Sequence, residues 1–489
     1  MSAESAAAMT SGTASPADVP LCVDCDGTLI HSDLLHESAL RLVKRSVLQA
    51  LRMPFWFLQG KARAKERLAG AVDLDPAWLP YNEPFVDFLR AEKARGRRLV
   101  LATASPVVQA QAVADHIGVF DEVVATAGGI NLKGASKAER LIARFGEKGF
   151  DYAGNDGADV PVWKAARQAI VVNADGHTLD AARSVASVSR VFEGAGGGFL
   201  DMLRALRLHQ WLKNILVFLP LLAAHRQQEA ALVVDALLAF LAFGLCASSV
   251  YVVNDLLDLP ADRAHDRKRS RPFASGKVSI LRGTLMVPVL LACAAAIAAS
   301  LNPLYQLCLF GYLVLTTLYS LWLKNQVVVD VMLLAALYTS RVIAGAAATL
   351  IRPSFWLLAF SMFLFLSLAI IKRYSEMLVV LRSKRERAAG RGYTVHDLPV
   401  LMGLGTASGY CSVMVLALYV NSPDVGRLYP DRLVLWLLLP PFLYWISRAW
   451  MKTHRGEMHD DPVVFAARDW QSLVIAALIA AILVAATVL

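Results

Sequence analysis

The apolar residues of this 489-residue chain are distributed unevenly, and that distribution limits the folds open to it. From about Trp211 onward, apolar runs of roughly 20 residues recur, each long enough to cross a hydrocarbon layer about 30 Å thick. The first 195 residues contain no such run. We therefore expect a soluble front part followed by an all-α bundle of membrane-spanning helices.

The back part contains nine candidate spanning segments, which begin near residues 212, 231, 283, 303, 326, 355, 398, 433 and 469. The loops after even-numbered candidates, above all residues 262–282 and 372–391, are rich in Lys and Arg, whereas the other loops are nearly bare. Basic loops remain on the cytoplasmic side of a bilayer. We expect a multi-pass protein of a bacterial-type inner membrane, with the front part in the cytoplasm and the C-terminus outside.

Charge and cysteine content limit the other classes of function. The formal net charge of +9 would suit a nucleic-acid partner, but the basic residues gather in loops between apolar segments, so we expect none. Cys22 and Cys25 form a CxxC pair, yet no second pair or histidine cluster completes a zinc site. Residues 1–19 lack the basic and apolar regions of a signal peptide, which predicts a disordered tail.

Short apolar stretches in the front part alternate with helical patterns, which predicts a parallel α/β sheet. The predicted strands are residues 21–23, 97–102, short stretches near Val123 and Tyr152, and 170–172 as the last strand. The pattern over residues 34–82 is helical and predicts an insertion. We expect an α/β domain over 20–193, a glycine linker and interfacial helix over 194–210, and a membrane domain over 211–489. The amphipathic pattern of that helix runs from Phe199 to Lys213.

The first strand runs directly into Asp24, and Asp26 follows two residues later within Asp-Cys-Asp-Gly-Thr. At this spacing one carboxylate can attack a phosphorus while the second handles the leaving-group proton, with a hard cation nearby. A calcium-binding or turn-forming acidic cluster is the alternative. The apolar strand before the motif and the Gly-Thr after it favour the first interpretation.

This motif resembles the haloacid dehalogenase superfamily, in its phosphoserine-phosphatase-like branch with a small helical cap, over about residues 21–192. The resemblance implies a Rossmann-like fold and Mg²⁺-dependent phosphatase chemistry. The second motif of the family matches Thr103, and its lysine matches Lys137, with Lys133 as the rival. The implied catalytic residues are Asp24, Asp26, Thr103 and Lys137, and the implied metal ligands are Asp24, Asp26 and Asp159.

The acidic fourth motif departs from the family pattern. Asn155 stands where the first aspartate is usual, while Asp159 keeps the second position and Asp156 offers a replacement ligand. An amide keeps a ligand oxygen but loses a charge, which weakens Mg²⁺ binding. A degenerate regulatory front domain therefore stays open beside a catalytic one.

A second acidic motif ends the second spanning candidate, where Asp255 is followed by Asp258 and Asp262. If the stretch is helical, Asn254, Asp258 and Asp262 share one face. Carboxylates at a membrane boundary repel one another unless a cation holds them, and oxygen-only ligands indicate Mg²⁺. A solvated acidic helix end is the alternative. The basic residues that follow suit a metal-bridged diphosphate, and they are Arg267, Lys268, Arg269 and Arg271.

The pattern NDxxDxxxD with its basic stretch resembles the UbiA superfamily of intramembrane prenyltransferases, over about residues 203–489. Most members carry a second acidic motif, DxxxD, which this sequence lacks. The residues in its place make the chain similar to the decaprenyl-phosphate phosphoribosyltransferase branch. That branch joins phosphoribosyl pyrophosphate to a polyprenyl phosphate in the bilayer.

One diphosphate donor needs one metal-carboxylate site, whereas a lipid acceptor brings its own phosphate and needs cations. The resemblance implies that Asp255, Asp258 and Asp262 are catalytic residues and metal ligands. Taken singly, each basic residue implied to bind the acceptor phosphate also fits a residue that only marks the membrane boundary. Besides the basic stretch, the implied substrate-binding residues are Asn254, Lys213, Tyr319, Lys324, Arg341, Lys372 and Arg373.

The product of such a transfer would still carry a 5-phosphate on its ribose. A phosphatase tethered to the transferase would remove it at a high effective concentration. Two alternatives stay open: a conventional prenyltransferase that makes a quinone or haem-type lipid, and a front domain that binds or regulates without catalysis. The sequence also leaves a homo-oligomer open.

Overall fold

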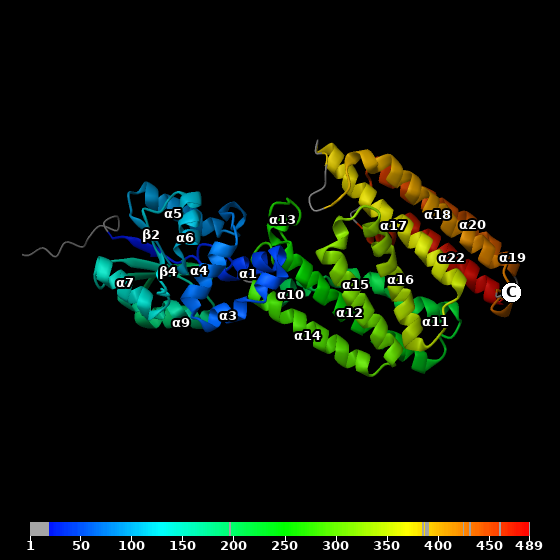
Figure 1. Ribbon diagram of the computed structural model, residues 1–489, viewed down its shortest axis with the longest axis horizontal. Coiled ribbons are helices and arrows are strands. Elements are labelled where there is room, and N and C mark those ends of the chain that lie inside the picture. Colours follow the sequence, from blue (N-terminus) through cyan, green and yellow to red (C-terminus); the bar gives the residue numbers. More distant parts are fainter. Residues whose placement is uncertain are drawn as a thin grey trace, which may run out of the picture. The chain divides into compact units, whose positions relative to one another are not determined.

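The computed structural model describes residues 19–194, 197–383, 386, 391–423, 425–429, 432–458 and 461–488 (Figure 1). The chain forms two compact units. Unit 1 combines Met1–Leu206 with Val252–Met286, and unit 2 combines Arg207–Tyr251 with Val287–Leu489. The division therefore differs from the boundaries expected from the sequence, because the acidic segment packs with the front part. Residues 1–18 of the predicted tail and residues 195–196 of the linker lie outside the described residues.

Unit 1 contains a six-stranded parallel sheet in the order β3-β2-β1-β4-β5-β6. Its strands are β1 (Leu21–Val23), β2 (Leu99–Pro106), β3 (Glu122–Thr126), β4 (Asp151–Gly154), β5 (Gln168–Val172) and β6 (Ser187–Phe192). The prediction that the sheet ends with residues 170–172 is wrong, because β6 adds an edge strand. Its side chains are mostly exposed, so it lacks the apolar run that marks the inner strands.

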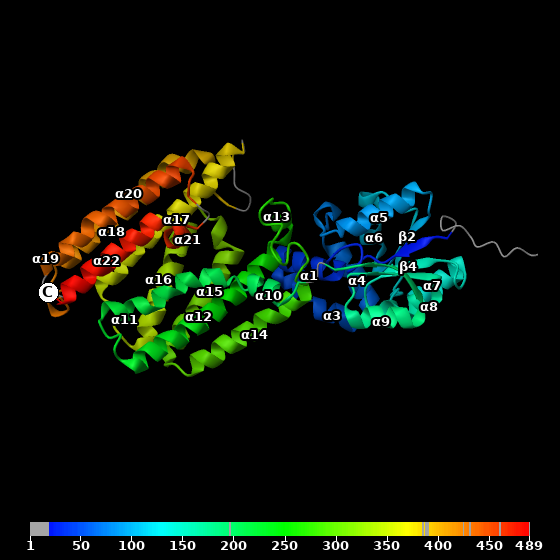
Figure 2. The same ribbon diagram turned by 180° about the vertical axis from the view of Figure 1, so that it is seen from behind.

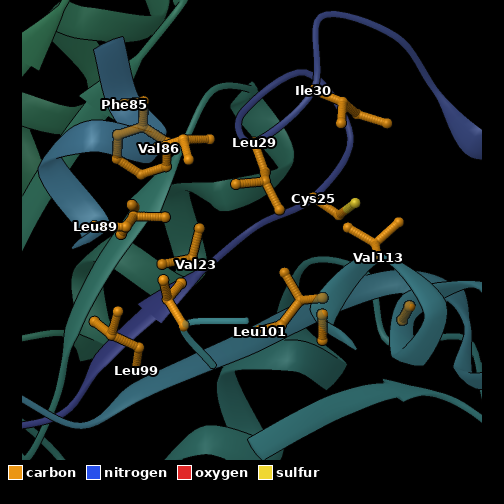
Figure 3. Packing of buried hydrophobic residues seen from close by; sticks show 14 of the residues in the cluster. Val23, Cys25, Leu29, Ile30, Phe85, Val86, Leu89, Leu99, Leu101 and Val113 are labelled. Carbon is orange, nitrogen blue, oxygen red and sulfur yellow. The ribbon is translucent and has the colours of Figure 1, made fainter. Parts of the chain in front are cut away.

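Side chains alternate between the two faces of this sheet, as pleated strands require. Val23, Leu99 and Leu101 pack on one face against helix α5 (Glu83–Ala94) and helix α6 (Val107–Ile117), as Figure 3 shows. Cys22 and Val100 pack on the other face, against α7 (Ala135–Phe145), α8 (Val160–Ala165) and α9 (Gly176–Val185). Figures 1 and 2 show these two helical layers on opposite sides of the sheet.

The insertion between β1 and α5 is helical, as the sequence predicts. It contains α1 (Leu34–Arg45), α2 (Val47–Ala50), α3 (Met53–Leu58), α4 (Lys61–Ala71) and the short η1 (Pro76–Trp78). Asp33 caps α1, because its carboxylate accepts from the first backbone N–H groups of the helix. The cap thus begins directly after the Asp24–Asp26 loop.

Among the described residues, eight helices are long and apolar enough to span a membrane. In order they include α12 (Ala230–Leu257), α14 (Ile280–Ala299), α15 (Pro303–Leu321), α16 (Val329–Thr349), α17 (Phe355–Arg382), α18 (Leu398–Val420), α20 (Leu439–Arg455) and α22 (Trp470–Val488). Short helices α19 (Arg432–Leu435) and α21 (Pro462–Arg468) flank α20. The expected α/β front and helical membrane part are therefore confirmed.

The first of the nine expected spans is shorter than the others. It consists of the 3-10 helix η3 (Leu208–Phe218) and the five-residue helix α11 (Leu219–Ala223). The single amphipathic helix predicted from Phe199 to Lys213 is likewise divided. Helix α10 (Phe199–Ala205) ends before Arg207, whose φ of +52° places it in the left-handed region that a helix cannot continue through.

Candidate functional site

The Asp24–Asp26 loop lies at the carboxyl end of β1, between β2 and β4, where parallel α/β sheets bind ligands. Asp26 is held from two sides: its Oδ1 accepts from the backbone N–H of Leu34 at 2.9 Å, and its Oδ2 accepts from the Ser105 hydroxyl at 2.6 Å. Gly27 has φ +76°, and a Cβ there would lie 2.1 Å from the Asn155 amide nitrogen. The glycine of the motif therefore permits both the turn and the close approach of Asn155.

Lys137 joins the nucleophile candidate to the fourth motif. Its Nζ donates to Asp24 Oδ1 at 2.9 Å and to the Tyr152 hydroxyl at 2.7 Å, and that hydroxyl donates to Asp159 Oδ1 at 2.8 Å. All four side chains are largely or fully buried. A buried carboxylate and ammonium that share hydrogen bonds hold each other in position.

Burial and neighbouring charges shift the pKa values of this group. Burial raises the pKa of Asp24 to about 6, although Lys137 acts against that shift. Burial, Asp33 and Asp24 raise the pKa of Asp26 to about 7. Burial alone would lower the pKa of Lys137, but Asp24 and Asp159 outweigh it and raise that pKa. A carboxyl with a pKa near neutrality suits proton transfer, which fits the role expected for Asp26.

The rival lysine is placed differently. Lys133 is exposed, and its Nζ lies 3.9 Å from Asp156, which is also exposed. Thr103 is fully buried, and its hydroxyl accepts from the backbone N–H of Ser105 at 3.1 Å. The Asn155 side-chain oxygen accepts from the Thr28 hydroxyl at 3.2 Å. The fold thus brings Lys137, but not Lys133, to Asp24.

The three carboxylates expected to hold a metal in the front site are not assembled around one point. Lys137 Nζ lies 2.9 Å from Asp24 and 3.5 Å from Asp159, between the two. Both Asp159 oxygens already accept hydrogen bonds, from Tyr152 and from backbone N–H groups. Asp24 and Asp26 remain oxygen donors of the kind that fits Mg²⁺, whereas Asp159 positions Tyr152 and the fourth loop.

Lys65 of the cap reaches the same site and was not found from the sequence. Its Nζ donates to the backbone carbonyl of Ala104 at 2.9 Å, at the end of β2. Burial lowers the pKa of Lys65, and Asp26 acts against that shift. A lysine within a helical insertion carries no motif, so only the tertiary contact distinguishes it.

The acidic segment after α12 keeps a helical hydrogen-bond pattern across a short break. The N–H of Asp258 donates to the Asn254 carbonyl and the N–H of Asp262 donates to the Asp258 carbonyl, both at 2.9 Å. Asp262 lies on the short helix α13 (Leu259–Arg263). These i to i+4 bonds place Asn254, Asp258 and Asp262 on one face, as predicted.

Cations pair with these carboxylates. Arg271 donates to Asp255 at 3.2 Å and to Asp262 at 2.6 Å, and Lys44 of α1 donates to Asp258 at 3.1 Å. Across the described part of the chain, no three Asp, Glu, His or Cys side chains stand close enough to hold a metal ion. The acidic segment still offers only oxygen donors, which fit Mg²⁺ in kind. Of the basic stretch, Arg271 meets the acidic residues, while Arg267, Lys268 and Arg269 are exposed.

Next to the acidic residues, Arg263 makes a buried ion pair that the sequence did not indicate. Its guanidinium donates to both carboxylate oxygens of Glu37 in α1, at 2.7 and 3.1 Å, and to the Ala274 carbonyl at 3.0 Å. The Ser32 hydroxyl also donates to Glu37. The side chains of Arg263 and Glu37 are only 6% and 2% exposed. This contact attaches the cap to the acidic segment within unit 1.

Unit 2 buries a cation among neutral groups. Arg341 of α16 is 4% exposed; its Nε donates to the Asn214 side-chain oxygen at 3.0 Å, and it also donates to the Leu337 carbonyl. Three aromatic rings surround the guanidinium at 5.2 to 5.6 Å, those of Phe243, Tyr312 and Tyr338. A buried cation that these neutral groups surround is costly unless an anion compensates it.

Lys213 lies beside the residues that hold Arg341. Its ammonium pairs with Asp461 and lies 5.6 Å from the centre of the Tyr338 ring. Burial alone would raise the pKa of Asp461, but Lys213 and Lys372 lower it. Asp461 precedes α21 and belongs to no motif considered above. Lys213 and Arg341 thus lie beside the same ring, that of Tyr338. Lys372 is close enough to help lower the pKa of Asp461.

The remaining predicted residues of unit 2 form a separate group. Arg373 is fully buried and pairs with Asp330 at 2.6 Å and with Glu376. Tyr393 donates to Asp330 at 2.6 Å. Arg391 donates to the Tyr319 hydroxyl at 3.3 Å and to the Lys324 carbonyl at 3.2 Å. Arg373 therefore lies in a buried ion-pair network with Asp330 and Glu376.

An apolar hollow of about 490 Å³ lies next to the Lys213 neighbourhood in unit 2. Its lining comes from the sequence neighbours of Lys213 in η3, from α12 and from helix α21, which follows Asp461. The lining residues are Leu208, His209, Trp211, Leu212, Ile215, Phe240, Val464, Ala467 and Arg468. Apolar side chains make up most of this lining, and His209 and Arg468 are its polar members.

The comparisons with known proteins agree with both parts. The UbiA prenyltransferase family model matches residues 215–473, and the haloacid dehalogenase-like hydrolase model matches residues 21–186. The chain is 38% identical to the uncharacterized protein y4nM of Sinorhizobium fredii over 474 residues, 96% of this chain and 91% of that one. It is 34% identical to a decaprenyl-phosphate phosphoribosyltransferase of Corynebacterium glutamicum over 243 residues, 48% of this chain and 72% of the relative.

A solved UbiA homolog from Archaeoglobus fulgidus, bound to GPP and Mg²⁺, is 18% identical, with 59% of this chain and 100% of that chain covered and a TM-score of 0.45. The UbiA model alone spans more than half of the chain. The two family models confirm both resemblances noted in the sequence. The chain belongs to the UbiA prenyltransferase family and carries a haloacid dehalogenase-like domain in front of its membrane part.

Proposed function

We propose that the membrane part transfers 5-phosphoribose from phosphoribosyl pyrophosphate to a polyprenyl phosphate, and that the front domain then removes the 5-phosphate. The observation that carries the proposal is Arg341, a cation buried among neutral groups in a transferase without a second acidic motif. An acceptor that brings its own phosphate would compensate this buried positive charge. The Corynebacterium glutamicum relative bears the name of this reaction.

In the transfer step, an oxygen of the lipid phosphate attacks C1 of the ribose, and the bond from C1 to the diphosphate breaks. Pyrophosphate leaves with the bonding electrons, and no proton needs to move because the attacking phosphate is already anionic. Arg341 and Lys213 would orient the acceptor phosphate, and the hollow beside Lys213 would take part of the prenyl chain. Arg271 would contact the departing diphosphate.

A Mg²⁺ ion held by Asp255, Asp258 and Asp262 would neutralise charge on the diphosphate. Binding it requires Arg271 to move from between Asp255 and Asp262 toward the diphosphate. Asn254 shares the face of Asp258 and would offer a further oxygen to the ion. The acidic segment is therefore suited to bind phosphoribosyl pyrophosphate through a metal ion. Arg341 is suited to bind the lipid phosphate.

In the second step, a carboxylate oxygen of Asp24 attacks the phosphorus of the 5-phosphate, and the bond to the ribose oxygen breaks. Asp26 gives its proton to that oxygen, then accepts a proton from the water that hydrolyses the phospho-aspartate and releases phosphate. Lys137 holds Asp24 in place. Asp24 and Asp26 would hold a Mg²⁺ ion that offsets the charge of the phosphoryl group.

The transfer step is tested with the full chain in lipid nanodiscs, supplied with phosphoribosyl pyrophosphate, Mg²⁺ and decaprenyl phosphate. Asp258→Asn should abolish pyrophosphate release and lipid product while the protein stays folded. Asp266→Asn, an exposed position in the same loop, should leave both unchanged. Release at the wild-type rate in Asp258→Asn would refute the assignment of the acidic segment to the donor.

The second step is tested by mass spectrometry of the same product. The wild type should yield polyprenyl-phospho-ribose without the 5-phosphate, whereas Asp24→Asn should accumulate the 5-phosphorylated lipid. Asp87→Asn, an exposed front-domain aspartate, serves as the control. Identical phosphorylated product from wild type and Asp24→Asn would exclude the front domain as the phosphatase for this lipid.

A further inference from the structure

The cap of the front domain carries an apolar surface over α2 and α3. This segment, Val47–Leu58, is one of two short apolar helical stretches that the described part of the chain contains besides the eight long helices. Leu48 and Leu58 are 78% and 84% exposed, and the exposed apolar side chains on this surface are Val47, Leu48, Leu51, Phe55, Phe57 and Leu58. We call this set the cap patch. Contiguous apolar groups of this kind mark a surface that binds an apolar partner.

The opposite side of the same segment is already packed. Ala50 is buried, and Met53 and Trp56 contact a small core formed with Leu42 of α1 and Leu68 of α4. A helical stretch that is apolar on both sides either lies deep inside a protein or meets lipid. Here one side is satisfied by the cap itself and the other points outward.

The position of the cap patch in unit 1 indicates the bilayer as the partner. Lys44 contacts Asp258 at 3.1 Å, and Asp258 directly follows the spanning helix α12. Val47, the first residue of the patch, is three residues after Lys44, a reach of at most about 10 Å. The patch therefore begins near the end of a helix long enough to span a membrane.

The charges around the cap patch fit a lipid surface as well. Exposed cations flank the apolar side chains along the segment, namely Lys44, Arg45, Arg52, Lys61 and Arg63. Apolar and aromatic side chains bordered by Lys and Arg are typical of segments that lie in the headgroup layer of anionic membranes.

We propose that α2 and α3 insert their exposed side into the headgroup layer and so seat the phosphatase site on the membrane that contains its lipid-linked substrate. Helix α4 follows α3 after Gly60 and carries Lys65, which contacts the end of β2 beside the Asp24–Asp26 site. Insertion of α2 and α3 would thus hold helix α4, with Lys65 beside the Asp24–Asp26 site, at the bilayer surface. The seating role rests on the proposed phosphatase function, whereas the insertion itself does not.

The insertion is tested by fluorescence in the full chain in nanodiscs that contain phosphatidylglycerol. An environment-sensitive fluorophore is attached at Leu58→Cys, in a background where the exposed Cys293 and Cys411 are replaced by Ser. Val108→Cys on α6, 70% exposed in the same domain, is the matched control. Doxyl-labelled lipid should reduce the fluorescence at position 58 and leave position 108 unchanged.

Equal insensitivity of both positions to doxyl lipid would overturn the insertion. A blue-shifted emission at position 58 without quenching by lipid would also overturn it, because the patch would then be covered by protein, either this chain or a second copy. These measurements need no catalysis, so they stand whether or not the front domain is a phosphatase.

The seating role is tested with Leu48→Glu/Leu58→Glu, which places charges in the headgroup layer. This variant should keep its activity on the soluble substrate p-nitrophenyl phosphate and lose most of its activity on the 5-phosphorylated lipid in the bilayer. Val108→Glu should keep both activities. If both activities of the double variant equal those of the wild type, the seating role is wrong. If the wild type hydrolyses neither substrate, the proposed phosphatase function fails, and the quenching result still decides the insertion.

Discussion

Lys133 and Lys137 lie four residues apart, yet the fold gives them opposite environments. Lys133 is exposed and pairs with the exposed Asp156 at 3.9 Å, whereas Lys137 is buried and donates to Asp24 at 2.9 Å. Helix α7 begins at Ala135, so only Lys137 is fixed on the helix that faces the site. The start of helix α7 thus decides which of the two lysines contacts Asp24.

This pair provides a matched test at the residue scale. Lys137→Met should lower the phosphatase rate by about 10²-fold or more, because a charge that positions Asp24 and the phosphoryl group is removed. Lys133→Met should leave the rate nearly unchanged. Rates on p-nitrophenyl phosphate would measure both. A larger loss from Lys133→Met than from Lys137→Met would reverse the assignment.

At the scale of elements, Glu37 and Arg263 attach helix α1 to helix α13. Both side chains are almost fully buried and their hydrogen bonds are bidentate. Arg263 is adjacent to Asp262, so the same contact orients the acidic segment. Loss of one partner leaves an unpaired buried charge, which costs about 3–5 kcal/mol.

Glu37→Ala and Arg263→Ala should each lower the melting temperature of the purified chain, and the double variant should lose less than the sum of the two. Arg263→Ala should also raise the KM for phosphoribosyl pyrophosphate, since Asp262 loses its support. Asp87→Ala, which breaks an exposed pair with Arg90, should cost less than about 1 kcal/mol. Strictly additive effects of the two buried changes would argue against a direct pair.

For the whole molecule, two contacts within unit 1 constrain the path of the chain through a membrane. Glu37 and Lys44 precede the first apolar segment, yet they contact Arg263 and Asp258, which follow α12. Both groups must lie on one side of the bilayer, so the chain crosses an even number of times between them. Helix α12 supplies one crossing, and we therefore expect residues 208–223 to supply the other.

The length of that shorter segment is sufficient. Eleven residues of 3-10 helix at about 2.0 Å each, followed by five of α-helix at about 1.5 Å each, span about 30 Å. This is the thickness of a hydrocarbon core. If residues 208–223 cross, this segment and the eight long helices of the described residues would make the nine crossings expected from the charge pattern.

The path is tested with single cysteines in a background without the exposed native ones. Ser270→Cys should react with an impermeant reagent from the cytoplasmic side, and Gln227→Cys and Asn421→Cys from the opposite side. All three positions are exposed. Labelling of positions 227 and 270 from the same side would show that residues 208–223 do not cross.

The sequence by itself determined what depends on near neighbours along the chain. The apolar runs predicted the spanning helices because a helix needs about 20 residues to cross a bilayer. The four-residue spacing of Asn254, Asp258 and Asp262 predicted one shared face because helical geometry is local. The motif at Asp24 could be predicted as the end of a strand for the same reason.

Only the tertiary structure decided which distant side chains meet. The pairing of Glu37 with Arg263 joins residues 226 positions apart, and that of Lys213 with Asp461 joins residues 248 positions apart. No periodicity links such residues, because their contact depends on how whole helices pack. The same reason explains the buried pair of Arg373 with Asp330, which no sequence pattern indicates.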